Sequence, residues 1–163
     1  MLAITTGGLE LRPLPAEAAS ALPGSREEVV GRLGVKLSSS WPQADLLDIL
    51  PAHARRPPDQ ICWGIWVIID RAEALVVGDA GFHGPPSEDG SVELGFSVVP
   101  RHRRRGHASA AAAALATWAA DQPGVAAVVA GCDPQNEASA RTLARAGFRQ
   151  TGRDENELRW RLG

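Results

Sequence analysis

The segment VELGFSVVPRHRRRGHASAAAAALATWA, from Val92 to Ala119, decides the fold. It begins as an apolar strand, passes through a cluster of arginines and one glycine, and continues as an alanine-rich run. We expect a strand over Val92–Val99 and a helix from about His107 to Ala120. A further apolar run, VAAVVAGC, follows from Val125, so this unit predicts a right-handed parallel strand–helix–strand crossover.

The junction between this strand and helix has the chemistry of a phosphate site. The first turn of a helix exposes unpaired backbone N–H groups and the positive end of the helix dipole, and such a terminus binds phosphate. Gly106 lets the backbone approach a ligand closely, because it has no Cβ. We expect the ring of amides to come from six consecutive residues: Arg104, Arg105, Gly106, His107, Ala108 and Ser109.

Composition limits the other roles that the arginine cluster could have. The chain has 163 residues, a net charge of −2 and a pI of about 6.1, so it lacks a global basic field for nucleic acid. RHRRR is locally basic, but no aromatic neighbours for base stacking accompany it. A solvated turn and a nucleic-acid patch stay open as alternatives. A dinucleotide-binding fold is excluded, since no G-x-G-x-x-G follows the first strand.

Outward from this segment, the chain alternates between strand and helix signals. Ser25 and Glu28 form a capping box for a helix that Gly34 ends, and a second helix over Trp41–Leu50 is closed by Pro51. A final helix is expected from Asn136 to Ala146. Five further strands are expected. The first is an edge strand at Gly8–Leu14, and the others are Cys62–Asp70, Ala74–Gly84, Gly147–Gly152 and Asn156–Leu162. The order predicts an α+β fold, a mixed sheet with helices on both faces, in a single domain over residues 1–163.

The two cysteines, Cys62 and Cys132, are too few for a disulfide framework and lack metal-ligand spacing. We expect them to be buried, reduced thiols, and we expect no metal. No apolar run reaches about 18 residues, and no signal peptide opens the chain. The sequence therefore predicts a cytoplasmic protein without membrane contact.

Several of these segments together resemble the GNAT acyltransferase family. Arg103-x-x-Gly106-x-Ala108 is similar to the family's (Q/R)-x-x-G-x-(G/A) signature, which holds the pyrophosphate of acetyl-CoA. NEASARTLARAGF, from Asn136 to Phe148, resembles the N-x-x-S…G-F segment of the family. GLELRPL and GDAGFHG…VELGFSV also fall where the family has them. The similarity covers nearly the whole chain and is closest to the RimJ/RimL-like branch, which includes the ribosomal-protein N-terminal acetyltransferases.

The resemblance implies a GNAT fold, with a central, mostly antiparallel sheet of about six to seven strands. It implies acetyl-CoA as co-substrate and direct acetyl transfer to a primary amine in a ternary complex. The acceptor would be a protein N-terminus, an amino acid or another small amine, and a homodimer is common in the family. The pyrophosphate would lie on the loop at Arg103–Ser109. Pantetheine would bind the backbone of Phe96, Ser97, Val98 and Val99, with the Val98 N–H facing the acetyl oxygen.

The same resemblance assigns the catalytic side chains. Glu93 is expected to take the proton of the amine, and Asn136 to cap its helix while contacting the cofactor. Ser139 is expected near the sulfur or the pantetheine, and the departing thiolate would take its proton from Ser139 or from water, or leave unassisted. One departure matters: the position of the family's tyrosine is Leu143, and the chain contains no tyrosine. This absence leaves open a non-catalytic acyl-CoA-binding or regulatory domain.

Overall fold

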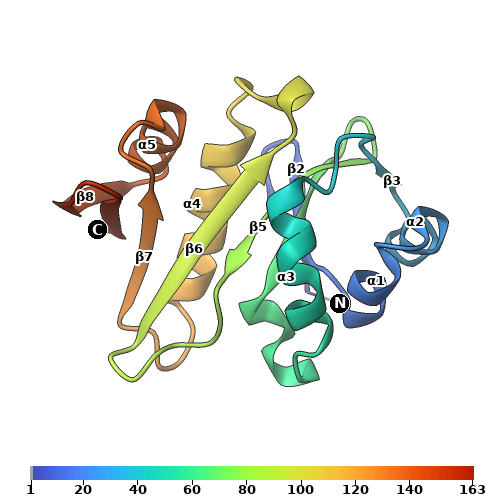
Figure 1. The fold of residues 1–163 in the computed structure, drawn as a ribbon, viewed down its shortest axis with the longest axis horizontal. Helices are drawn as coiled ribbons and strands as arrows, with labels where there is room; N and C mark the ends of the chain where they lie inside the picture. Colours follow the sequence, from blue (N-terminus) through green and yellow to red (C-terminus); the bar gives the residue numbers. More distant parts are fainter. Residues whose placement is uncertain (1) are drawn as a thin grey trace.

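The computed structural model describes residues 2–163 as one sheet flanked by helices (Figure 1). The described strands are β1 (Ile4–Thr6), β2 (Leu9–Pro13), β3 (Lys36–Leu37), β4 (Ile65–Asp70), β5 (Leu75–Phe82), β6 (Ser91–Val98), β7 (Ala127–Cys132), β8 (Phe148–Arg153) and β9 (Leu158–Leu162). The helices are α1 (Ala16–Ala21), α2 (Arg26–Leu33), α3 (Ala44–Ala54), α4 (His107–Ala120) and α5 (Glu137–Arg145). The strands are ordered β1-β2-β4-β5-β6-β7-β9-β8, and β3 pairs with β5.

This architecture confirms the expected mixed, mostly antiparallel sheet. Among the described residues, β6–β7 and β3–β5 are parallel pairs and the other pairs are antiparallel. The sheet has nine strands because it gains β1 and β3, which have three and two residues and no alternating pattern long enough to detect. β2 is consequently an inner strand rather than the expected edge. Within residues 2–163, no helix is both long enough and apolar enough to cross a membrane.

The helices cover the two faces of β6 differently. Val92, Leu94 and Val98 are buried on the face that packs against α4. The alternate side chains of β6 point to the opposite face, where α3 lies. In Figure 1, α3 lies in front of the sheet and α4 behind it. One face of β6 is therefore covered by α4 and the other by α3.

Local sequence signals explain most of the helix boundaries. The Ser25 side chain accepts a hydrogen bond from the Glu28 N–H at 3.2 Å, and Gly34 ends α2 with φ of 72°. The expectation that Pro51 closes α3 is wrong, because the helix continues to Ala54 with Pro51 inside it. The short helix α1 was not expected. It has six residues between Pro15 and Leu22, too few for a helical period to show in the sequence.

The central feature of the sheet is the separation of β6 from β7. The two parallel strands pair over Ser91–Glu93 and Ala127–Val129. Beyond Glu93, β6 continues to Val98 paired with β5 alone, while β7 continues paired with β9. The strands thus diverge toward their carboxyl ends, and a gap opens between them where the first turns of α4 and α5 begin (Figure 1).

Close backbone packing at Gly78 holds β5 against β6 beside this gap. A Cβ at Gly78 would strike the carbonyl oxygen of Ser97 and lie 3.0 Å from the Val98 Cα. We expect Gly78→Ala to lower the free energy of unfolding by about 1–3 kcal/mol, measured by urea denaturation. Gly31→Ala is the matched control, because nothing lies within 4 Å of that Cβ in α2, and it should raise stability by about 0.5–1 kcal/mol. Equal effects of both variants would contradict this account.

Candidate active site

The N-terminus of α4 leaves its first backbone donors free. Gly106 is the N-cap residue with φ of 80°, in the left-handed region that favours glycine, and it has no side-chain cap. The first hydrogen bond of the helix runs from the Ala110 N–H to the Gly106 carbonyl at 3.0 Å. The N–H groups of His107, Ala108 and Ser109 therefore have no partner within the helix. These three N–H groups form part of the ring of backbone amides that the sequence predicts at the start of the helix.

The arginines of the loop divide into two groups. Arg104 and Arg105 are exposed beside Gly106, and Arg104 has a φ of 64°. Arg103 turns back instead: its Nε donates to the Val98 carbonyl at 2.8 Å, and its guanidinium also donates to Gln43 Oε1 at 3.2 Å. Arg103 thus anchors the end of β6, while its two neighbours remain available to an anion.

The gap beside β6 exposes alternate backbone groups. The Val99 N–H donates to Val77 at 2.9 Å and the His83 N–H donates to Glu93 at 3.2 Å, so the odd-numbered residues of this strand face β5. The amides of Phe96 and Val98 therefore face the gap. Ser97 pairs with Asp79 of β5, and the Val99 carbonyl accepts a hydrogen bond from the His102 N–H at 3.0 Å, so the backbone groups of these two residues are engaged outside the gap.

The N-terminus of α5 opens at the same end of the gap. β6 and β7 are parallel, so the helices that follow them begin at the same edge of the sheet. Asn136 is the N-cap of α5, and its Oδ1 accepts a hydrogen bond from the Ser139 N–H at 3.0 Å. Asn136 is exposed and Ser139 half-buried. Leu143 is fully buried, so the position of the family's tyrosine contributes to the core.

On the opposite face of the sheet lies a cleft of about 260 Å³, which we call the α3 cleft. Ser97 lines it, and its Oγ accepts a hydrogen bond from Gln43 Nε2 at 2.6 Å. Gly95 lines the cleft as well, and at this position no side chain projects into it. The complete lining is Asp45, Leu46, Ile49, Gly64, Ile65, Asp79, Ala80, Gly81, Phe82, His83, Gly95, Phe96 and Ser97.

The α3 cleft contains a buried acid that sequence analysis missed. Asp79 is 8% exposed, and its Oδ2 accepts a hydrogen bond from Trp41 Nε1 at 2.9 Å. Burial is the largest effect on the pKa of Asp79 and raises it; the Trp41 hydrogen bond lowers it and the nearby Asp45 carboxylate raises it, so that the pKa lies at about 6. No Lys, Arg or His is paired with Asp79 in the described part of the chain. A carboxyl in a cleft with a perturbed pKa is a typical functional candidate.

Glu93 lies near the surface of the protein. Its side chain is 46% exposed, and its Oε2 is 3.4 Å from His83 Nδ1. His83 lines the α3 cleft, whereas Glu93 does not. Glu93 therefore stands beside the mouth of the cleft, and it stays a candidate base on the strength of the resemblance.

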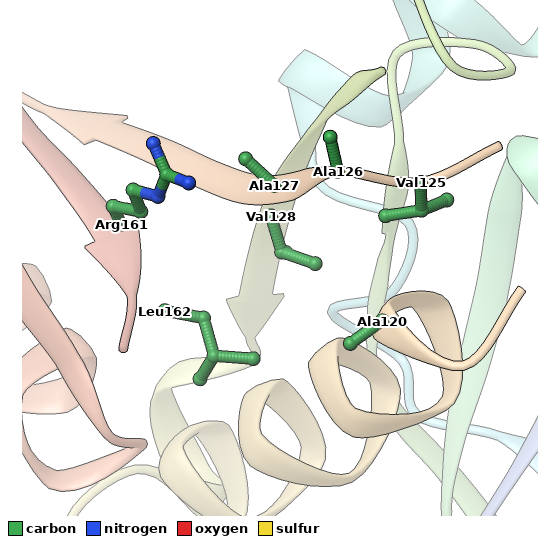
Figure 2. Close-up of a pocket in the computed structure, with 7 residues that line it drawn as sticks. All are labelled: Ala120, Val125, Ala126, Ala127, Val128, Arg161 and Leu162. Carbon is green, nitrogen blue, oxygen red and sulfur yellow. The ribbon is translucent and has the colours of Figure 1, made fainter.

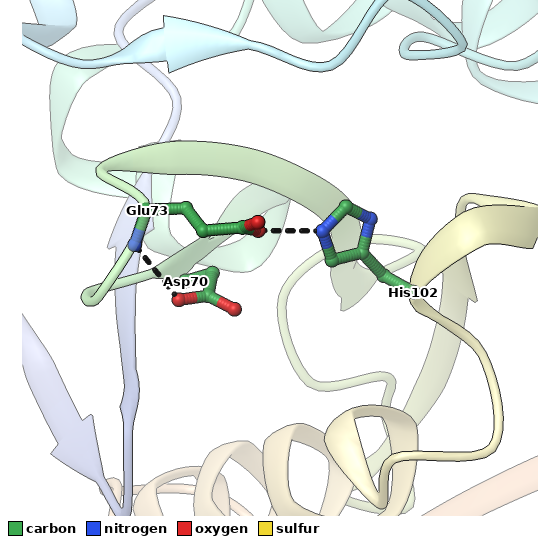
Figure 3. Close-up of side chains that lie close together, drawn as sticks. All are labelled: Asp70, Glu73 and His102. Carbon is green, nitrogen blue, oxygen red and sulfur yellow. Dashed lines mark hydrogen bonds and ion pairs between the residues drawn. The ribbon is translucent and has the colours of Figure 1, made fainter.

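Two acids and one histidine, Asp70, Glu73 and His102, lie close together beside the loop that leads into α4 (Figure 3). His102 is buried, and its Nε2 is 2.7 Å from Glu73 Oε2. Candidate ligand atoms of Asp70, Glu73 and His102 lie within 4.8 Å of one another. The 2.7 Å contact is a hydrogen-bond distance, shorter than the roughly 3.3 Å between two ligands of one tetrahedral zinc. We interpret the group as an ion pair that ties the loop to the β4–β5 turn.

A second cavity of about 100 Å³ lies at the other end of α4 (Figure 2). Its lining includes Ala120, Val128 and Leu162, with Arg161 as the one titratable side chain among the lining residues. A cavity without a nucleophile, acid or base offers no catalytic chemistry. The free cysteines add none nearby: Cys62 and Cys132 are unpaired and half-buried rather than buried, and burial raises the pKa of Cys62.

Comparisons with known proteins agree with this geometry. The family model described as an acetyltransferase (GNAT) domain matches residues 9–149. The uncharacterized N-acetyltransferase YjdG of Bacillus subtilis (strain 168) is 28% identical over 151 residues, covering 91% of this chain and 90% of that protein. Similar solved structures include the ribosomal-protein-S5-alanine acetyltransferase from Vibrio fischeri, with a TM-score of 0.63, 15% identity, and 99% and 95% of the two chains covered. Another is RimL, a ribosomal L7/L12 alpha-N-protein acetyltransferase, with a TM-score of 0.65, 17% identity, and 98% and 92% covered.

Burying Asp79 has a measurable cost. Its pKa is about 6 in the native state, against 3.8 for a solvated carboxyl. At about 1.4 kcal/mol per pKa unit, its ionisation costs the native state about 3 kcal/mol at neutral pH. The cost is small below pH 4, where the native carboxyl is protonated, and it grows as the pH rises to 6.

We therefore expect Asp79→Asn, which keeps an acceptor for Trp41, to stabilise the protein by about 2 kcal/mol more at pH 7.5 than at pH 4. Urea denaturation of both proteins at the two pH values measures the difference. Asp48→Asn, at an exposed position on the same helix as Asp45, is the control and should show no such difference. A gain for Asp79→Asn that is independent of pH would rule out an ionised carboxylate at this site.

Proposed function

Because the chain belongs to the GNAT acetyltransferase family, we propose that it transfers the acetyl group of acetyl-CoA directly to a primary amine. The observation that carries the proposal is the gap between β6 and β7, with unpaired amides along its edge and two helix N-termini at its open end. The family name supports acyl transfer. The donor and the residues that hold it are our assignment.

Acetyl-CoA would lie along this gap. Its pyrophosphate would accept hydrogen bonds from the amides at Gly106, His107, Ala108 and Ser109, with Arg104 and Arg105 beside it. Pantetheine would run past Phe96 and Val98 toward Glu93. One of these two amides would donate to the acetyl oxygen as negative charge develops there, which is the usual electrostatic contribution to acyl transfer. Asn136 and Ser139, at the start of α5, would border the cofactor at the open end of the gap.

The α3 cleft would receive the acceptor. Gly95 lies between the cleft and the gap, and a Cβ built on it would have a single neighbour within 4 Å, His83 Nε2 at 3.6 Å. An amine could therefore approach the thioester across this bare position. The described residues that line the cleft include two acids and no Lys or Arg. This charge favours an amine without a neighbouring carboxylate, such as a peptide N-terminus, over a free amino acid.

The phosphate assignment predicts a separation of folding from cofactor binding. Ser109→Asp places a carboxylate in the first turn of α4, where it interacts favourably with the helix dipole and repels a diphosphate. We expect the variant to keep its melting temperature and to bind acetyl-CoA at least about tenfold more weakly by calorimetry. Thr117→Asp adds the same charge to the exposed far part of α4 and should leave the affinity unchanged. Equal affinities for all three proteins would place the cofactor elsewhere.

The acceptor assignment predicts discrimination by charge. An alanine-initiated hexapeptide amide should gain one acetyl group, detected as a mass shift with matching CoA release. After correction for the different pKa values of the two amines, the kcat/KM of free alanine should be at least about tenfold lower than that of the peptide. The reason is that the carboxylate of free alanine has no cationic partner in the cleft. The difference in basicity is measured separately by titration of both amines. Preference for free alanine would overturn the assignment of acceptor class.

A non-catalytic binding domain remains the alternative that the missing tyrosine suggests. It predicts acetyl-CoA binding without CoA release from any amine. A screen of peptide amides, alkylamines and polyamines for thiol release separates the two functions, because turnover with any acceptor excludes the binding domain.

A further inference from the structure

Asp79 is a buried acid without a cationic partner in a sheet that otherwise buries apolar side chains. Its Oδ2 is held by Trp41, and its Oδ1 has no hydrogen-bond partner among the described residues. The side chain lines the α3 cleft, so its carboxylate is one of the polar groups that an incoming acceptor can meet there. We propose that Asp79 takes the proton of the acceptor amine. The inference rests on the proposed function.

The sheet register places Asp79 beside the candidate acetyl site. Asp79 is the direct cross-strand partner of Ser97, the residue between the two amides that face the gap. The backbone of Asp79 therefore lies one strand spacing, about 5 Å, from the β6 segment that carries Phe96 and Val98. The face is the correct one as well, because Gly95 opens the cleft toward the gap next to this pair.

Glu93 is less well placed for the same task. It lies three residues from Phe96 and five from Val98 on the same strand, or about 10 and 17 Å at 3.4 Å per residue. It is half-exposed and interacts with His83 at the mouth of the cleft. One amine nitrogen cannot touch both carboxylates directly, so the two residues are competing assignments for one role.

The step balances without any further reagent. The ammonium form of the acceptor enters the cleft and gives one proton to the Asp79 carboxylate, leaving a neutral amine. The amine nitrogen bonds to the acetyl carbon, the carbon–sulfur bond breaks, and the departing sulfur takes the second proton from nitrogen. Asp79 then releases its proton through the cleft to solvent. The products are the amide, CoA thiol and one proton.

The charges around Asp79 set the pH at which it works. Asp45 faces it from α3, and His83 lies at the end of β5 in the same cleft. Arg103 donates a hydrogen bond to Gln43, which in turn donates to Ser97, the residue paired with Asp79. Glu93 does not line the cleft. Asp45 raises the pKa of Asp79 and the Trp41 hydrogen bond lowers it, with burial as the largest effect. The pKa of about 6 keeps the carboxyl ionised, and able to accept a proton, at neutral pH.

The test is the pH dependence of kcat/KM for alaninamide and for the alanine-initiated hexapeptide amide, between pH 5 and 8.5. For the wild type we expect an acid limb near pH 6, where Asp79 protonates, and a plateau up to the amine pKa near 8. For Asp79→Asn only neutral amine reacts, so kcat/KM should climb about tenfold per pH unit across this plateau. At pH 7 the loss should be roughly hundredfold or more.

Three further variants test the assignment through its neighbours. Asp45→Asn should move the acid limb to lower pH and Trp41→Phe to higher pH, while Asp48→Asn should leave it in place. An Asp79→Asn profile that keeps the break near pH 6 and the plateau above it overturns the inference, and so does loss of that break in Glu93→Gln alone. A wild-type protein that releases no CoA with any amine refutes the proposed function instead, so the two failures are distinguishable.

Discussion

The structure depends on one interruption of sheet pairing, the departure of β6 from β7 after Glu93. A backbone amide left without a partner is costly unless water or a ligand satisfies it. Interactions on both strands keep them apart. β7 stays paired with β9, and Arg103 donates a hydrogen bond to the Val98 carbonyl, the last of β6. The His102–Glu73 pair fixes the following loop to the β4–β5 turn. The unpaired amides are therefore a maintained feature of the fold.

On the opposite face of the sheet, Asp79 likewise lowers the stability of the fold while it provides a group that can react. An asparagine would satisfy Trp41 equally well, without the cost of an ionised carboxyl at neutral pH. Apolar surroundings and a neighbouring acid both oppose its charge. A bound ammonium group would relieve both effects at once, which is the physical reason to place the acceptor there.

The cofactor side could be predicted from sequence because its signals are local. Gly106 as a helix start, the helix that follows it and the N-cap at Asn136 each depend on a few consecutive residues. Asp79 could not be found this way: it lies within an apolar strand, and its partner Trp41 is 38 residues distant. The alternation of backbone groups at Ser97 and Val99 also requires the strand register, which the sequence leaves open.

This difference follows from how the two halves of the site are built. The cofactor half is one continuous segment from β6 into α4 with the start of α5 beside it, so its residues keep fixed spacings. The acceptor half combines α3 with the middle of β5, which are separated in sequence by a 3-10 helix and β4, so the spacing of its residues is set only by tertiary packing. A change in α3, at Asp45 or Ile49, would reshape the cleft while the backbone pairing of β6 with β5 stays the same. The architecture can therefore keep one donor while its acceptor varies.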